Sequence, residues 1–350
     1  MKSGKKSKSI PSKLKVVDLF SGCGGKTKGF ENAGYNLIGA FDNWRPAVDV
    51  YRANFKGHEI HEVDLSKTDE CIKIIKKLKP DIIIGGPPCQ DFSHAGKRNE
   101  DLGRGDLTVS FAKIVSSVKP QWFVMENVDR ILSSRKIRIV YEKLKKAGYG
   151  LTCTILDASF CGVPQKRKRF FMIGEKGGVD NQLIPYLEKD LSASPLTVRQ
   201  YFKDALDVDY YYRHPRNYNR RGIYSVDEPS ATIRGVNRPV PKGYPGHSAD
   251  PVPMTSTMRS LTTKERSLIQ TFPEDFVFQG SKSNIEQMIG NAVPVKLAEY
   301  IARCIKDYVS DRKKGKILKC RNNRLPLLLV DSAVTKSSSP VQREFDYAMA

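Results

Sequence analysis

Residues 14–25 read LKVVDLFSGCGG, a short apolar strand that runs directly into a glycine-rich turn. A helical stretch follows over residues 27–33. Glycines at such a position let the backbone turn sharply and approach a ligand, and the N-terminus of the helix favours electronegative groups. The stretch therefore predicts the first strand, turn and helix of an α/β fold, with the turn as a candidate ligand site.

The same strand-then-helix unit repeats through the first half of the chain. Strands are predicted over residues 14–20, 36–42, 81–85, 121–126, 151–157 and 169–174, and helices over 27–33, 47–54, 69–78, 107–118 and 136–147. Strand runs such as Ile82-Ile83-Ile84 are apolar without interruption, as expected where helices cover both faces of a parallel strand. The pattern predicts right-handed βαβ units and a doubly wound, mostly parallel, Rossmann-like α/β sheet.

The repeat ends after residue 174, and regular structure returns only near residue 260. The segment between is rich in Pro, Tyr, Asn and Arg. Two more helices are predicted, and the second has one apolar stripe; they cover residues 260–270 and 294–309. We therefore predict a basic N-terminal arm (1–13), a catalytic, cofactor-binding domain (14–174), a smaller inserted domain (175–258), helices that complete the first domain (259–310), and a basic, partly disordered tail (311–350).

The chain has 350 residues and carries 59 Lys and Arg against 38 Asp and Glu, a formal net charge of +21. Such an excess points to a polyanionic partner, in the first place nucleic acid. No apolar run approaches the roughly 20 residues that span a bilayer, and the Lys- and Ser-rich start lacks the apolar segment of a signal peptide. The composition therefore predicts a cytoplasmic protein with no membrane partner.

Seven cysteines and five histidines are scattered along the chain, without a Cys-x-x-Cys pair. A structural zinc site needs four clustered ligands, so no metal site is predicted, and the thiols of a reducing compartment are expected to be free. Cys71, Cys153 and Cys304 lie inside predicted elements and are expected to be small core residues. Cys23 is expected to pack in the glycine turn.

Polar residues follow the first strands of the predicted sheet. Gly22 and Gly24 lie in the first turn, Asp42 ends the second strand, and Asp64 lies in the third turn. Because open α/β sheets bind ligands at the carboxyl ends of their strands, and an acid after the second strand can accept hydrogen bonds from a ribose, these loops form one candidate site. The Gly-x-Gly-x-x-Gly dehydrogenase fingerprint is not met, because Lys28 stands three residues after Gly25. NAD, another nucleotide, S-adenosylmethionine or a plain tight turn all remain compatible with these residues.

The most specific signal is GGPPCQDFS at residues 85–93, after the Ile-rich strand. Two prolines fix the backbone just before Cys89, and polar residues follow it. Reactive thiols lie at such strand-to-loop junctions, where the thiolate is stabilised and accessible. Cys89 is therefore predicted to be a nucleophile in preference to a packing residue.

Charged side chains mark two further strand ends. Glu126 opens ENV at residues 126–128, where a carboxylate can protonate or hydrogen-bond a ring nitrogen, with an ordinary loop acid as the alternative. QKRKR at residues 165–169 precedes an apolar strand, and alternation predicts Arg167 and Arg169 on one face for phosphate or base-edge contacts. A solvated basic strand end is the alternative. QMIGNAVP at residues 287–294 is predicted to form a Gly-Asn turn that opens the last helix.

Taken in order, these segments resemble the C5-cytosine DNA methyltransferase family of bacterial restriction–modification systems. The order matches from residue 14 to about 309 through DLFSGCGG, FDN, DLS, GGPPCQDFS, ENV, QKRKR, a variable region and QMIGNAVP. The resemblance implies the Rossmann-like fold of S-adenosylmethionine-dependent methyltransferases, with a target-recognition domain in the variable region. The family's Thr-Leu pair is Thr232-Ile233 here, a departure that weakens any contact assigned to Ile233.

The resemblance implies an enzyme that transfers a methyl group from S-adenosyl-L-methionine to a cytosine flipped out of duplex DNA. Cys89 would attack C6, Glu126 would hydrogen-bond or protonate N3, and Arg169 with Arg167 would hold the base and the reacting loop. By the same matching, the cofactor contacts would come from Phe20, Gly22, Gly24, Asp42, Asp64, Leu107 and Asn291.

Partners follow from the same resemblance. Double-stranded DNA would be contacted by the recognition region, where the candidate residues for base or phosphate contacts are Arg220, Arg221, Thr232 and Arg234. The chain is expected to act as a monomer that protects host DNA from a cognate restriction endonuclease. Two alternatives stay open: a tRNA cytosine-5 methyltransferase, and a catalytically silent DNA-binding relative.

Overall fold

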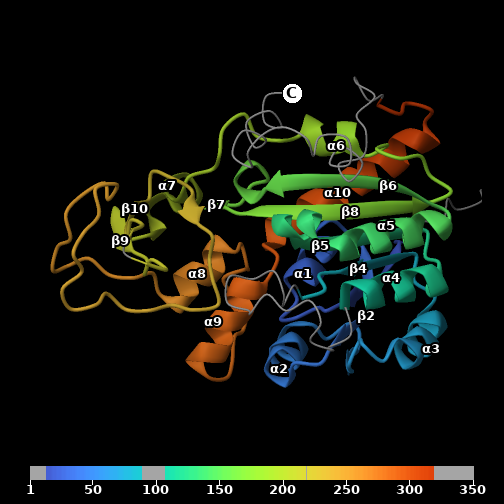
Figure 1. Ribbon diagram of the computed structural model, residues 1–350, viewed down its shortest axis with the longest axis horizontal. Coiled ribbons are helices and arrows are strands. Elements are labelled where there is room, and N and C mark those ends of the chain that lie inside the picture. Colours follow the sequence, from blue (N-terminus) through green and yellow to red (C-terminus); the bar gives the residue numbers. More distant parts are fainter. Residues whose placement is uncertain (1–12, 89–106, 218, 319–350) are drawn as a thin grey trace, which may run out of the picture.

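The computed structural model describes residues 13–88, 107–217 and 219–318. Cys89, the N-terminal arm up to residue 12 and residues 319–350 of the tail lie outside these described residues. Figure 1 shows a large layered body and a smaller, mostly irregular part that extends beyond one end of the sheet. Within the described residues, no helix is long and apolar enough to cross a lipid bilayer.

A seven-stranded sheet forms the centre of the large body, with the strand order β3-β2-β1-β4-β5-β8-β6. Strands β1 to β5 pair in parallel, whereas β8 runs antiparallel to both β5 and β6. The topology confirms the predicted doubly wound, mostly parallel α/β class. The strands are β1 (Lys15–Leu19), β2 (Asn36–Asp42), β3 (Ile60–Glu62), β4 (Ile82–Gly85), β5 (Trp122–Val128), β6 (Tyr149–Asp157) and β8 (Lys168–Lys176).

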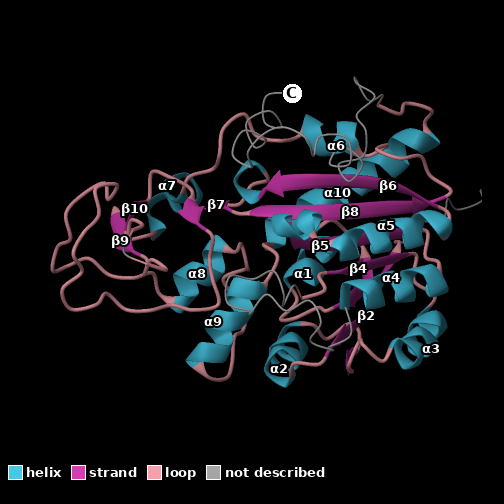
Figure 2. Cartoon of the chain, viewed as in Figure 1, coloured by secondary structure: helices cyan, strands magenta, loops and turns pink. Residues whose placement is uncertain are grey.

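Helices cover both faces of the sheet (Figure 2), which explains why its central strands are apolar without alternation. One face carries α3 (Thr68–Leu78), α4 (Leu107–Val118) and α5 (Arg135–Lys146), and the other carries α1 (Gly25–Asn32), α6 (Ile184–Lys189) and α10 (Val295–Lys313). Helix α2 (Arg45–Asn54) packs in a third cluster with Phe272 and Phe276. The alternation of strands and helices is therefore the pattern that the sequence predicts.

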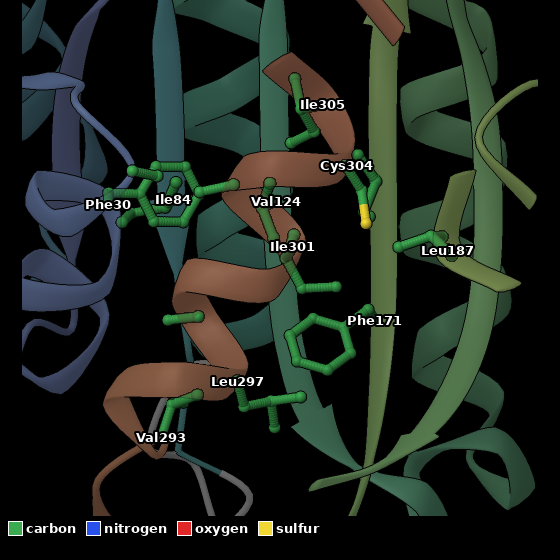
Figure 3. Close-up of a cluster of buried hydrophobic side chains, with 14 of the residues drawn as sticks. Phe30, Ile84, Val124, Phe171, Leu187, Val293, Leu297, Ile301, Cys304 and Ile305 are labelled. Atoms are coloured by element: carbon green, nitrogen blue, oxygen red, sulfur yellow. The ribbon is translucent and has the colours of Figure 1, made fainter. Parts of the chain in front are cut away.

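Helix α10 buries the apolar stripe expected from the sequence. Figure 3 shows Leu297, Ile301 and Ile305 beside Val124 and Phe171 of the sheet. α10 also lies directly against α1, since a Cβ at residue 29 would be 2.5 Å from a carbonyl oxygen of α10, and that residue is glycine. The C-terminal helix thereby fixes the position of the glycine turn that opens α1.

The smaller part has its own core, in which Tyr211, Ile233, Leu261 and Ile289 are buried together. Its elements are α7 (Val198–Phe202), β9 (Tyr210–Tyr212), β10 (Ile223–Ser225), β11 (Ser230–Ala231), α8 (Thr263–Ile269) and α9 (Lys282–Asn291), and short 3-10 segments are η1 (Asp129–Ser133), η2 (Ala158–Phe160) and η3 (Lys203–Ala205). β11 pairs in parallel with β7 (Gln165–Lys166), which leads into β8. The β7–β11 pair therefore joins the smaller part to the strand that carries QKRKR.

One predicted turn is wrong. The sequence predicts a Gly-Asn turn at the start of the last helix, but Gly290 and Asn291 end a separate helix, α9. Glycine and asparagine are poor helix formers, so the sequence pattern hides this last helical turn. A Cβ at Gly290 would lie 2.2 Å from the backbone of Arg234, so the glycine permits close packing.

The predicted domain boundaries do not coincide with the two parts of the structure, because elements beyond each boundary pack with the other part. The boundary at residue 175 falls inside β8, and α6 still packs on the large core through Tyr186 and Leu187. Conversely, α8 and α9 contribute Ile269 and Ile289 to the smaller core. The core against which a helix packs decides to which part it belongs, and a local sequence pattern does not show these contacts.

Candidate active site

Most of the predicted site residues lie at one edge of the sheet. Phe20 follows β1, Asp42 ends β2, and Glu126 lies near the end of β5. Because β8 runs in the opposite direction, its first residues, including Arg169, lie at this same edge. One antiparallel strand therefore adds a basic residue to the edge where the parallel strands end.

The turn after β1 has a conformation that few side chains adopt. Phe20, Gly22 and Gly24 have positive φ angles of 54°, 55° and 99°. The carboxylate of Asp42 accepts hydrogen bonds from the N–H of Gly22 at 2.8 Å and of Trp44 at 2.9 Å. Asp42 thus fixes the turn to the end of β2.

The two glycines of this turn have different surroundings. A Cβ at Gly24 would lie 2.3 Å from the ring of Phe55, so a side chain there would disturb the core. A Cβ at Gly22 would meet no atom of the described residues within 4 Å. The turn therefore faces open space at Gly22, where a ligand can approach the backbone.

Asp64 lies close to Asp42. The N–H of its neighbour Val63 donates to the carbonyl oxygen of Asp42 at 2.9 Å. Asp64 is exposed, and hydrogen bonds from Ser66 lower the pKa of its carboxyl group, so it is an anion at neutral pH. Leu107 is half-buried as the first residue of α4, directly after residues that are not described, and its contact with the turn stays a prediction.

The end of α9 approaches the turn from the opposite direction. Asn291 is exposed at the last residue of this helix. Two residues on, the carbonyl oxygen of Val293 would lie 2.4 Å from a Cβ at Gly25, so the chain after α9 touches the start of α1. The structure therefore brings Asn291 and the glycine turn into one neighbourhood.

Glu126 and Arg169 form an ion pair between β5 and β8. Arg169 Nε lies 3.0 Å from Glu126 Oε1, and the two side chains are only 14% and 12% exposed. A Cβ at Gly86 would lie 2.8 Å from Glu126 Oε2, so the glycine after β4 leaves room for the carboxylate. A buried, paired carboxylate thus stands where the loop toward Cys89 begins.

Asn127 fastens that loop to β5. Its Nδ2 donates to the carbonyl oxygen of Pro87 at 3.2 Å, and the side chain is buried. Asn127 belongs to the ENV motif, but the sequence alone does not reveal this role. Cys89, two residues after Pro87, lies outside the described residues, and its position relative to Glu126 stays a prediction.

Arg167 is not on the same face of a strand as Arg169, which corrects the prediction. It stands between β7 and β8, so strand alternation does not apply to it. Its guanidinium donates to the carbonyl oxygens of Ile233 at 3.1 Å, Gly290 at 3.0 Å and Ala292 at 3.1 Å, and only 2% of the residue is exposed. Arg167 therefore joins Ile233 of the smaller part to the end of α9 from inside the protein.

Two glutamines complete this junction: Gln165, which opens QKRKR, and Gln270, the residue after α8. Gln165 accepts from the N–H of Ile233 at 2.9 Å and donates to Gln270 at 2.7 Å. Gln270 in turn donates to the carbonyl oxygen of Ala292 at 3.0 Å. The side chains of Arg167, Gln165 and Gln270 are all buried, and they form one polar network inside the protein.

Thr232 lies at the seam between the two parts. Its Oγ1 donates to the carbonyl oxygen of Lys166 at 2.8 Å. Arg213 donates to the carbonyl oxygen of Thr232 at 2.8 Å. Arg213 belongs to the Tyr- and Arg-rich run but not to the predicted contact residues, because the sequence does not show which arginine of that run faces Thr232.

The three predicted arginine contacts differ in what they already bind. Arg220 is exposed, whereas Arg221 forms an ion pair with Glu228 at 2.5 Å. Arg234 is half-buried and donates to the carbonyl oxygen of His214. Of these arginines, Arg220 offers its charge most directly to an anion.

The described cysteines are all buried. Burial raises the pKa of each thiol, to about 12 for Cys23, so none of them is a thiolate at neutral pH. The prediction that Cys71, Cys153 and Cys304 are core residues is confirmed. Among the residues that the structure describes, no group of three or more His, Cys, Asp or Glu side chains is arranged to hold a metal ion.

The model of the C-5 cytosine-specific DNA methylase family matches residues 14–307, from β1 through the Glu126–Arg169 pair into α10. The chain belongs to this family. It is therefore a DNA (cytosine-5)-methyltransferase, as the order of its motifs predicts.

Two methyltransferases are similar to this chain over nearly their whole length. Type II methyltransferase M.HindV of Haemophilus influenzae is 56% identical over 293 residues, which cover 83% of this chain and 96% of that protein. Type II methyltransferase M.HgiDI of Herpetosiphon aurantiacus is 54% identical over 297 residues, which cover 85% and 96%.

Solved structures of more distant proteins share the fold. The Entamoeba histolytica methyltransferase EhMeth matches with a TM-score of 0.64 at 18% identity, over 85% of this chain and 99% of that one. The S. pombe Dnmt2 methyltransferase matches with a TM-score of 0.62 at 18% identity, over 84% and 99%. The layered sheet of this C-5 cytosine methylase is therefore a methyltransferase fold.

Proposed function

We propose that this methyltransferase acts on a cytosine flipped out of a specific duplex DNA sequence, with S-adenosylmethionine as the methyl donor and Cys89 as the nucleophile. The Glu126–Arg169 pair carries the proposal, because it holds a carboxylate beside the loop that leads to Cys89. The described cysteines support it too, since their burial leaves them unreactive.

The residues around the glycine turn fit S-adenosylmethionine. Gly22 leaves open space at the turn, and each oxygen of the Asp42 carboxylate accepts one backbone hydrogen bond and keeps a second lone pair for a ribose hydroxyl. Phe20 would contact the adenine and Asp64 its amino group, while Asn291 would bind the methionine end. Gly24 shapes the turn against Phe55, and Leu107 would line the pocket.

Bound S-adenosylmethionine supplies an electrophilic methyl group on a positively charged sulfur. The protein has to make C5 of cytosine nucleophilic. The lone pair of the Cys89 thiolate forms a bond to C6, and the electrons of the C5–C6 double bond move toward C5 and the ring. Glu126 donates a proton or a hydrogen bond to N3, which stabilises the charge that develops there. Arg169 keeps the Glu126 carboxyl group in place.

C5 then forms a bond to the methyl carbon, whose bond to the donor sulfur breaks with its electron pair left on that sulfur. A base takes the proton from C5, the C5–C6 double bond re-forms, and Cys89 leaves as a thiolate. The products are 5-methylcytosine and an enzyme with its thiol free. The base must be flipped out, because its ring face is stacked in a duplex.

Recognition of the target would fall to the smaller part. Arg220 is the most available of the predicted contacts, and Thr232 is held at the seam with the catalytic sheet. Arg221 and Arg234 would have to exchange protein partners to reach DNA. Since M.HindV and M.HgiDI, to which the chain is similar, are type II methyltransferases, we propose that the enzyme protects host DNA in the bacterial cytoplasm from a cognate restriction endonuclease.

The proposal is tested by parallel assays with tritiated S-adenosylmethionine on duplex DNA and on transfer RNA. The expected result is label in DNA that requires Cys89, with bisulfite sequencing showing one modified cytosine in one recurrent motif. Preferential labelling of RNA would overturn the proposed substrate. Binding of DNA without any methyl transfer would indicate the silent relative instead.

A further inference from the structure

Lys26 is a buried cation at the cofactor turn. It is the second residue of α1, and only 8% of it is exposed. Both features are unfavourable, because the first turn of a helix carries a partial positive charge and a buried ammonium loses its hydration. A charged lysine side chain at this position therefore needs partners that offset both the repulsion from the helix N-terminus and the lost hydration.

The ammonium binds the turn itself. Its Nζ donates to the carbonyl oxygen of Phe20 at 2.9 Å, while Asp18 Oδ1 lies farther away, at 3.4 Å. Phe20 is a non-glycine residue at φ 54°, so its carbonyl orientation requires support. The shorter contact of Lys26 is therefore with the backbone of the residue predicted to hold the adenine.

Asp18 is the negative partner of Lys26 and is fully buried. Its Oδ2 accepts a hydrogen bond from Thr27 at 2.9 Å, whereas Oδ1 has no hydrogen-bond partner among the described residues. Burial raises the pKa of this carboxyl group to about 6, and Lys26 acts against that shift. Asp18 thus balances the charge of Lys26, whereas the shorter contact of the ammonium is with the carbonyl oxygen of Phe20.

Lys26 also lies near Gly86, the glycine that follows β4 on the way to Cys89. Its Nζ would lie 3.6 Å from a Cβ at Gly86, and Glu126 Oε2 would lie 2.8 Å from the same point. The ammonium and the carboxylate therefore flank Gly86 together. Arg169 binds the other oxygen of the carboxylate, Oε1.

We propose that Lys26 is a positioning residue that links the cofactor turn to Glu126. It fixes the carbonyl oxygen of Phe20, and hence the turn beneath the cofactor, and it places a positive charge beside Gly86 that steadies the Glu126 carboxylate opposite Arg169. One side chain thereby sets the relative positions of the methyl donor and the target base. The inference rests on the proposed function, because it assigns the two ligands to these two places.

The test compares Lys26→Met with Lys28→Met. Methionine keeps the length of the side chain and removes the charge and its donors. Lys28 lies on the same helix but is 32% exposed and pairs only loosely with Glu31, at 3.8 Å. The dissociation constant of S-adenosylhomocysteine is measured by calorimetry without DNA, and the single-turnover rate of methyl transfer is measured at saturating cofactor and DNA.

Lys26→Met should raise the dissociation constant about tenfold, as expected for the loss of one charged hydrogen bond, and should also lower the saturated rate by about tenfold. Lys28→Met should leave both values at the wild-type level. If Lys26→Met changes neither value, the inference is wrong.

A double substitution separates this role from that of a simple counter-ion. Asp18→Asn combined with Lys26→Met leaves no unpaired buried charge, so it remains informative if Lys26→Met alone unfolds. The proposal requires that both defects persist in the double variant. If the double variant instead has the wild-type affinity and rate, Lys26 serves only to neutralise Asp18, and the inference is wrong.

Failure of the inference is distinguishable from failure of the proposed function. A wild-type protein that binds S-adenosylhomocysteine and methylates DNA, with Lys26→Met equal to it, contradicts only the role of Lys26. A wild-type protein that does neither contradicts the proposed function itself.

Discussion

Asn127 Nδ2 donates to the carbonyl oxygen of Pro87 across 3.2 Å, and this bond ties the segment before Cys89 to the end of β5. Glu126, the preceding residue, is bound by Arg169 from β8. Two consecutive residues of one strand therefore serve different purposes: one presents a carboxylate, and the other holds the backbone that leads to the nucleophile.

Asn127→Ala should slow methyl transfer about tenfold to a hundredfold in single-turnover assays at saturating substrates, because the buried Pro87 carbonyl loses its donor. Cofactor affinity should stay at the wild-type level, since the side chain of Asn127 donates to Pro87 and not to the glycine turn. Asn32→Ala, a surface change on α1, is the matched control. A wild-type rate in folded Asn127→Ala would show that this hydrogen bond does not position the loop.

Glu126→Gln should lower the rate of methyl transfer at least about a hundredfold, because glutamine has no proton of suitable acidity for N3. Arg169→Met should cause a similar loss by releasing the carboxylate. In a double-mutant cycle the two losses should not add, since both residues act through one pair. Fully additive losses would mean that Arg169 acts independently of Glu126.

Arg167→Met should act mainly on stability. The buried carbonyl oxygens of Ile233 and Gly290 lose this donor, while that of Ala292 keeps its bond from Gln270, so the free energy of unfolding should fall by about 3 kcal/mol or more. Lys168→Met, at the exposed neighbouring residue, should cost much less, and chemical denaturation of both variants provides the comparison. Equal stability of Arg167→Met and the wild type would refute the junction described for Arg167.

Asp18 gives stability a specific dependence on pH. Its pKa is about 6 in the folded protein against an ordinary value of 3.8, because burial outweighs the opposing effects of Lys26 and Thr27, with Asp42 and Tyr51 also close. The folded state therefore binds more protons than the unfolded state between these values, and stability is lost as the pH rises through them. Relative to Asp18→Asn, the wild type should lose on the order of 2 to 3 kcal/mol between about pH 4 and pH 7 in urea titrations. A difference that stays constant with pH would contradict this assignment.

The sequence was sufficient for those parts of the fold that depend on local pattern. Uninterrupted apolar runs predict the central strands, the apolar stripe predicts α10, and the glycine-rich stretch predicts the turn after β1. β3 is an edge strand of three residues, too short to show a pattern. α9 was missed because Gly290 lies in its last turn, where only contact with Arg234 explains the glycine.

The candidate site was predictable where one motif supplies one function, as for Glu126 in ENV. It was not predictable where function depends on which distant segment a side chain meets. Arg167 and Arg169 are two residues apart in one motif, yet one binds the backbone of α9 and the other binds Glu126. Lys26 likewise looks like an ordinary helix lysine until its contact with Phe20 is known.

The covalent mechanism is the central claim, and a trapped adduct tests it most directly. Wild-type protein is incubated with S-adenosylmethionine and duplex DNA that carries 5-fluorocytosine at the target position, and the product is analysed by denaturing electrophoresis and peptide mass spectrometry. Because fluorine at C5 cannot leave as a proton does, we expect a stable protein–DNA adduct through the peptide that contains Cys89, absent in Cys89→Ala. An enzyme that methylates ordinary cytosine in DNA but forms no such adduct, or forms it through another residue, would show that Cys89 is not the covalent nucleophile.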